Sequence, residues 1–202
     1  MDQALPTGCR RWPRRLASGW GRAVFVWLMV LLVGFGPVPA VQAAELELVN
    51  FELTAADDGL MLTYAVNFDL SRGVDDALNK AVPLFFVAEA QVFRSRWYWR
   101  DQRVAQAVRV WRIVYQPLTS TYRVTFGGLS QNYGSRAEAL AAISRGVRWK
   151  IADLGQIDSA SGGHYVEFSY RLDTSLLPRP MQIGIDGQPD WELAVERTQR
   201  IN

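Results

Sequence analysis

Residues 60–68, Leu-Met-Leu-Thr-Tyr-Ala-Val-Asn-Phe, set the pattern that decides the fold. Successive side chains of a β-strand point to opposite faces, so residues two apart share a face. Large apolar side chains recur at every second position of this stretch, which is typical of a half-buried strand. That face carries Leu60, Leu62, Tyr64, Val66 and Phe68.

The same alternation recurs along the chain and predicts about nine strands. Short strands separated by turns favour a sandwich of antiparallel sheets over alternating strand–helix units. We therefore predict an all-β, immunoglobulin-like β-sandwich that forms a single domain over residues 44–202. Further runs lie at residues 122–126, 147–151, 166–172 and 191–195, and turn signals at Asp57-Asp58-Gly59, Ser161-Gly162-Gly163 and Asp186-Gly187.

Two short helical segments are expected among the strands. Ser135 is a good N-cap, and Glu138 three residues later completes a capping box. Gly146 is expected to end this helix. A shorter helical turn is predicted over residues 74–81, because Pro83 disfavours helix in the residue before it.

Residues 83–100 contain a change of parity. Alternate apolar side chains from Leu84 to Val92 share one face, whereas Phe93, Trp97 and Trp99 fall on the other. A β-bulge near Val92, or a strand that changes sheets, would reconcile the two sets, and both tryptophans are then expected in the core. Asp101-Gln102 then looks like a hairpin turn into a strand over residues 104–115.

The first 43 residues have the order of a bacterial export signal. Five arginines precede an apolar run over residues 23–33, and small residues at Val41 and Ala43 predict cleavage after Ala43. The alternative is an uncleaved N-terminal membrane helix, since residues 23–41 approach the ~20 apolar residues that span a bilayer. Either interpretation places the domain in the periplasm, or on the inner membrane facing the periplasm.

The predicted leader accounts for the basic composition of the chain. It holds five of the 22 Lys and Arg residues but one of the 20 Asp and Glu residues, which leaves 17 basic and 19 acidic residues. A nucleic-acid partner therefore has no support from composition. Cys9, the only cysteine, lies in the leader, so the mature chain is expected to lack disulfides and reactive thiols.

No constellation in the sequence predicts catalysis, a metal or a cofactor. His164 is the only histidine, and we interpret it as an exposed residue between a turn and a strand. A Ser161–His164–Asp173 triad would need a rigid nucleophile turn that the sequence lacks. The pairs Asp57-Asp58 and Asp75-Asp76 are interpreted as turn and surface residues, because metal sites need oxygens that converge from several positions. We expect a protein that is not an enzyme.

One cluster has the composition of a binding face. Arginines beside aromatic residues can hold anionic or glycan ligands through forked hydrogen bonds and stacking. The cluster can equally be a solvated outer face, a protein-binding face, or a face for glycan or anionic lipid. Its members are Arg94, Arg96, Tyr98, Arg100 and Arg103.

Several spaced motifs resemble one bacterial family. They are Arg96-Trp97-Tyr98-Trp99, residues 111–119, Tyr122-Arg123-Val124 followed by residues 127–131, and residues 172–180. The chain is similar over residues 46–197 to the domain-of-unknown-function family 4390 of proteobacteria. This resemblance implies an exported protein without an established activity, often encoded beside a membrane sensor kinase of the nitrogen-regulation type.

Taken with the export signal, the resemblance favours a non-catalytic interaction module of the cell envelope. Its expected partner is an envelope protein, with the sensor kinase as one candidate. The membrane contact is the N-terminal segment if that segment is retained. A periplasmic protein that binds glycans or anionic ligands is the alternative.

Overall fold

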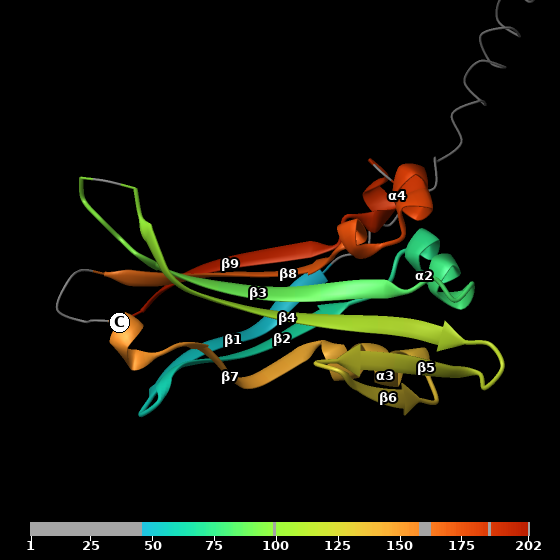
Figure 1. Ribbon diagram of the computed structural model, residues 1–202, viewed down its shortest axis with the longest axis horizontal. Coiled ribbons are helices and arrows are strands. Elements are labelled where there is room, and N and C mark those ends of the chain that lie inside the picture. Colours follow the sequence, from blue (N-terminus) through green and yellow to red (C-terminus); the bar gives the residue numbers. More distant parts are fainter. Residues whose placement is uncertain (1–45, 99, 158–162, 186, 202) are drawn as a thin grey trace, which may run out of the picture. The chain divides into compact units, whose positions relative to one another are not determined.

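The computed structural model describes residues 46–98, 100–157, 163–185 and 187–201 (Figure 1). The predicted leader or membrane helix, Trp99, and most of the Ser161-Gly162-Gly163 turn lie outside these residues. Among the described residues, no helix is long and apolar enough to cross a membrane.

Two antiparallel sheets pack face to face in the described domain (Figure 1). The smaller sheet has the order β1-β2-β7 and the larger one the order β6-β5-β4-β3-β8-β9. The predicted all-β sandwich is therefore confirmed. The strands are β1 (Leu46–Ala56), β2 (Gly59–Phe68), β3 (Leu84–Arg94), β4 (Gln102–Gln116), β5 (Thr121–Phe126), β6 (Leu129–Tyr133), β7 (Arg145–Ala152), β8 (His164–Leu172) and β9 (Ala194–Ile201).

The core forms where the alternating apolar faces of the two sheets meet. The ring of Tyr64 on β2 lies 4.7 Å from that of Phe168 on β8, and Phe68 lies 5.2 Å from Phe86 on β3. These contacts join strands from opposite sheets, which explains why the period-2 pattern identified the core residues. The buried face of β2 is the predicted one: Leu60, Leu62, Tyr64, Val66 and Phe68.

The β1–β2 hairpin turns at Asp57-Asp58, as predicted, and Ala56 pairs with Gly59. Gly59 has φ +146°, and a Cβ there would lie 2.1 Å from the carbonyl oxygen of Ala152. Only glycine fits this close approach between β2 and β7.

Two details of β7 differ from the predictions. The helix capped by Ser135 is α3 (Arg136–Ile143), which ends before Gly146, and Gly146 already belongs to β7. Arg148 has φ 45°, and the pairing of β2 with β7 shifts register beside it. This bulge exposes Val147, which was predicted to share the buried face of Trp149.

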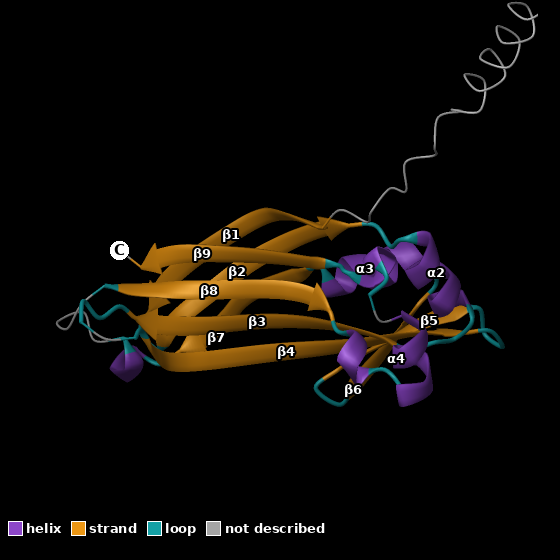
Figure 2. Ribbon diagram, turned by 90° about the horizontal axis from the view of Figure 1, so that it is seen from above, coloured by secondary structure: helices purple, strands orange, loops and turns teal. Residues whose placement is uncertain are grey.

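Helices α2, α3 and α4 gather at one end of the sheets (Figure 2). The predicted helical turn is α2 (Arg72–Asn79), whose N-cap Ser71 also donates a hydrogen bond to the carbonyl of Asp190 at 2.7 Å. The remaining helical segments are η1 (Leu154–Gln156), η3 (Thr174–Leu176), α4 (Arg179–Ile185) and η4 (Pro189–Trp191). Gly187 therefore lies between α4 and η4, rather than between strands as predicted.

The sheet register places the ends of the domain. Leu46 pairs with Phe68 at the end that carries α2. β3 runs from that end to Arg94, which pairs with His164, and His164 pairs in turn with Ile201. The first described residue and the β3–β4 loop therefore lie at opposite ends of the sandwich (Figures 1 and 2).

Candidate functional site

The loop between β3 and β4 is longer than the sequence suggested. The predicted bulge near Val92 is present, but the extra residue, Val104, lies on β4: Val92 pairs with Ala105 and Phe93 with Arg103. The chain then leaves the sheet after Arg94 and returns at Gln102. The predicted strand over residues 94–100 and its tight turn at Asp101-Gln102 are therefore wrong.

This loop is fastened by hydrogen bonds at both of its sides. The backbone N–H of Ser95 donates to the carbonyl of Gly163 at 2.9 Å, which ties the loop to the start of β8. The N–H of Arg96 donates to Asp101 Oδ1 at 3.1 Å, and its guanidinium donates to the side chain of Gln102. Side chains on the loop are thus presented from a supported backbone.

Trp97 lies at the tip of this loop and is 93% exposed. It was predicted to lie in the core, since it shares strand parity with Phe93. That prediction is wrong because the chain is no longer a strand at Trp97, so alternation does not apply. Tyr98 is 69% exposed, and its ring meets that of Trp97 edge-on at 5.0 Å.

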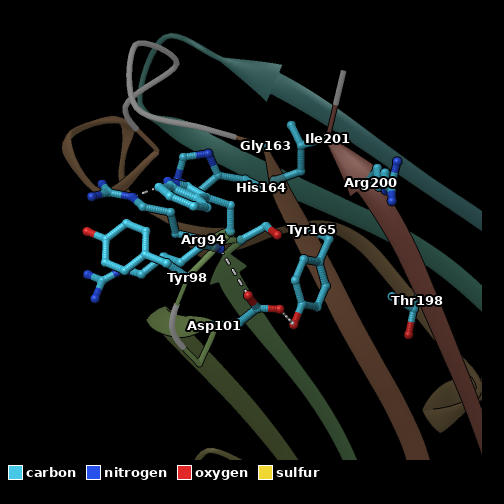
Figure 3. Close-up of a pocket in the computed structure, with 12 residues that line it drawn as sticks. Arg94, Tyr98, Asp101, Gly163, His164, Tyr165, Thr198, Arg200 and Ile201 are labelled. Atoms are coloured by element: carbon cyan, nitrogen blue, oxygen red, sulfur yellow. Dashed lines mark hydrogen bonds between the residues drawn. The ribbon is translucent and has the colours of Figure 1, made fainter.

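A groove of about 1140 Å³ opens between the loop, the start of β8 and the end of β9 (Figure 3). Segments separated by about a hundred positions in the sequence meet here because β8 pairs with both β3 and β9. The groove is lined by Arg94, Ser95, Arg96, Trp97, Tyr98, Asp101, Gly163, His164, Tyr165, Thr198, Arg200 and Ile201.

The charge in the groove is mainly positive. Arg94, Arg96 and Arg200 line it, against the single carboxylate of Asp101. Asp101 Oδ2 accepts a hydrogen bond from the hydroxyl of Tyr165 at 2.8 Å (Figure 3), in addition to the Arg96 N–H on its other oxygen. The only acidic group of the lining is therefore occupied in holding the loop.

Tyr165 lines the groove beside the Asp101 carboxylate. Its ring stacks on Phe93 with 5.3 Å between centroids. Burial, together with the hydrogen bond to Asp101, raises the pKa of the Tyr165 hydroxyl to about 12. The hydroxyl therefore stays protonated, and stays a donor to Asp101, at physiological pH.

His164 is buried, with 5% of its surface exposed, and not exposed as predicted. Its Nε2 lies 3.5 Å from the Nε of Arg94, which donates to it (Figure 3). Asp173 follows the far end of β8, which is nine residues long. At about 3.3 Å per residue, roughly 30 Å separates His164 from Asp173, so the two cannot belong to one triad.

The acidic pairs have structural positions. Asp57-Asp58 forms the β1–β2 turn, and Asp75 makes an ion pair with Arg136. Across residues 46–98, 100–157, 163–185 and 187–201, no three His, Cys, Asp or Glu side chains lie together as a metal site.

The predicted binding face is divided by the fold. Arg94, Arg96 and Tyr98 line the groove, and Arg100 is exposed in the loop outside the lining. Arg103 lies on the outer face of β4, where its guanidinium donates to Gln91 Oε1 at 3.4 Å. A binding role for these residues remains a prediction.

Sequence reasoning missed the half of the groove that β8 and β9 contribute. Tyr165, Thr198 and Arg200 carry no local motif, and Arg200 lies in an ordinary charged strand. Only the pairing of β8 with both β3 and β9 brings them to the loop, and strand pairing between distant segments is not encoded in periodicity.

Comparison with curated proteins gives no match, and neither does comparison with solved structures. A family model described as Domain of unknown function (DUF4390) matches residues 43–201, which include all the strands of the described domain. The chain therefore belongs to the DUF4390 family.

Proposed function

We propose that this chain is a non-catalytic interaction module of the bacterial cell envelope. It binds a partner protein through the β3–β4 loop and the groove beneath it. The observation that carries the proposal is Trp97, a large aromatic side chain that is 93% exposed beside Arg94 and Arg96 on a fastened loop.

Aromatic and arginine side chains are the residue types that dominate the energetics of protein interfaces. Covering a tryptophan removes about 150–250 Å² from water, which corresponds to roughly 4–6 kcal/mol before the costs of association are subtracted. Hydrogen bonds to Gly163 and Asp101 hold the loop at Ser95 and Arg96, which reduces the backbone freedom that these two residues lose on binding.

The charge of the groove favours an acidic partner surface. Arginine presents a planar fork of donors that fits carboxylates, and three arginines line the groove. The phosphates of nucleic acid could also bind these arginines. The N-terminal segment, however, predicts export, and an exported protein would not encounter nucleic acid.

The arrangement of the domain suits a module carried at the membrane surface. Leu46 lies at the end opposite the loop. A retained N-terminal segment would tether the domain through its Leu46 end, and the β3–β4 loop lies at the other end of the domain. Cleavage would release the same domain into the periplasm. A membrane sensor kinase is the partner that the family resemblance favours.

Binding of a glycan or another anionic ligand is the second candidate. The roughly 1140 Å³ groove, with three arginines, Tyr98 and Trp97 in its lining, favours it specifically, because sugars stack on aromatic rings and arginines bind acidic groups. Anionic cell-wall fragments would then quench or shift tryptophan fluorescence, whereas a protein-only interface predicts no response to them.

The two candidates are separated by capture from crosslinked envelopes, with partners identified by mass spectrometry. Three baits are compared: the natural chain, the double variant Arg96→Ala/Trp97→Ala, and Arg123→Ala as a control on β5 at the opposite end of the sheet. The proposal predicts one protein that the natural chain and the control capture and the double variant loses. Equal capture by all three baits would contradict it.

A further inference from the structure

The first part of β4 is hydrogen-bonded to a neighbouring strand on one side only. β4 is 15 residues long, but β5 pairs only with its second part, from Trp111 to Gln116. Residues 102–110 pair with β3 and with no strand on their other side within the described chain. In Figure 2, this part of β4 forms the border of the larger sheet.

An open edge of this kind exposes backbone hydrogen-bonding groups. In an antiparallel sheet, alternate residues direct N–H and C=O groups to the two neighbours in turn. Every second residue of this stretch therefore directs its backbone N–H and C=O groups away from β3, to the side on which β5 pairs further along β4. A sheet edge of this kind can accept an added strand.

Natural edges are usually protected by proline, charge or bulges, and the described edges differ in this respect. β7 is interrupted by the bulge at Arg148, and β9 carries charges along its length. On β4 the bulge lies at Val104, and residues 105–110 after it are regular and contain no proline. Val108 is 49% exposed and Val110 39% exposed on the outer face of this stretch.

Arg109 places a positive charge on the inner face of the same stretch, the face that is turned toward the smaller sheet. Its guanidinium lies 4.9 Å from the ring of Trp149 on β7, with which it makes a cation–π contact. Burial lowers the pKa of Arg109, opposed by the nearby Tyr64. None of the ion pairs formed among the described residues involves Arg109. A half-buried guanidinium without a carboxylate is a favourable site for one.

We propose that residues 105–110 of β4 bind an extended acidic segment of a partner protein, which adds as a further strand in line with β5. Period-2 geometry defines that segment: apolar side chains lie beside Val108 and Val110, and a carboxylate on the opposite face reaches Arg109. This surface is separate from the groove of the proposed function, since β3 lies between the open edge of β4 and strands β8 and β9.

A second copy of this chain fits the edge less well than an acidic segment. Two β4 edges paired antiparallel would bring together two copies of Arg103 and of Arg109 without acidic partners on β4. Like charges on adjacent strands are destabilising. Self-association is therefore the outcome that the following experiment must distinguish.

The probes are two synthetic peptides of about eight residues, one alternating valine with glutamate and the other alternating valine with lysine. Amide hydrogen exchange of the full chain is measured with each peptide, together with the dissociation constant. The proposal predicts slowed exchange at residues 105–110 with the glutamate peptide, and binding at least about tenfold tighter than that of the lysine peptide.

Two variants test the roles of the side chains. Arg109→Gln is expected to weaken glutamate-peptide binding about tenfold, and Val108→Lys/Val110→Lys to remove protection of the edge. The lysines replace partly exposed residues, so unfolding by urea checks that the fold persists. No protection at residues 105–110, or equal binding of both peptides, would overturn the proposal. Concentration-dependent protection of the edge without peptide would overturn it in favour of self-association.

Discussion

Replacing Trp97 with alanine separates the role of the loop from the stability of the fold. Trp97 is 93% exposed, and its described aromatic contact is the edge-on approach to the exposed Tyr98. Surface substitutions of this kind change stability by less than about 0.5 kcal/mol. With a urea m-value of about 2 kcal/mol/M, the unfolding midpoint should move by less than ~0.3 M.

Trp149 provides the matched comparison, because it is the same residue type with 6% exposure. Its replacement by alanine removes a core ring and one of the two cation–π contacts of Arg109, the one at 4.9 Å. Truncation of a buried tryptophan costs about 3–5 kcal/mol, so the urea midpoint should fall by roughly 2 M.

In a binding assay, Trp97→Ala should have the large effect that it lacks in urea unfolding. A tryptophan at the centre of an interface contributes about 2 kcal/mol or more, so Trp97→Ala should weaken partner binding at least ~30-fold at unchanged stability. A loss of about 3 kcal/mol of stability in Trp97→Ala would refute the reasoning, because it would place Trp97 in the core as strand parity had suggested.

Three further substitutions test the packing and the loop. Gly146→Ala should destabilise the domain by about 2–3 kcal/mol, since its Cβ would lie 2.2 Å from a ring carbon of Tyr64. An unchanged midpoint of urea unfolding would show that β7 and β2 can move apart at this position. Tyr170→Phe removes the 3.2 Å hydrogen bond to the last carbonyl of α3 and should cost about 1–3 kcal/mol, with an unchanged midpoint as the contrary result. Tyr165→Phe should lower stability by about 1 kcal/mol at pH 8 through loss of the hydrogen bond to Asp101. The pKa of Tyr165 is raised to about 12 in the folded state, from an ordinary value of 10. The natural chain should therefore exceed this variant in free energy of unfolding by the full amount below pH 10, and the difference should disappear as the pH rises from 10 through 12. A difference that persists at about pH 12.5 would contradict the assignment.

Periodicity predicted the strands well where the chain is a regular strand. The faces of β2 and β8 follow the alternation because each strand packs one side on the opposite sheet. The prediction failed at bulges, which shift parity by one residue: Val147 is exposed because Arg148 adopts a positive φ. The prediction that Trp97 is buried failed for a related reason, since alternation of faces applies only while the chain is a strand.

The candidate site could be predicted only in part. Arg94, Arg96 and Tyr98 were identified because arginine and aromatic residues alternate within one local segment. Tyr165 and Arg200 reach the same groove through the order of strands in the larger sheet. That order depends on packing between distant segments, so no local pattern carries it.

Photo-crosslinking from the loop tests most directly the claim that this surface binds a partner. Tyr98 is replaced by the photoreactive residue p-benzoylphenylalanine, and Arg123 on β5 is replaced in the same way as the control. After irradiation of living cells, the proposed function predicts one discrete protein adduct from position 98 that position 123 does not form. Absence of an adduct at position 98, or the same adducts from both positions, would contradict it.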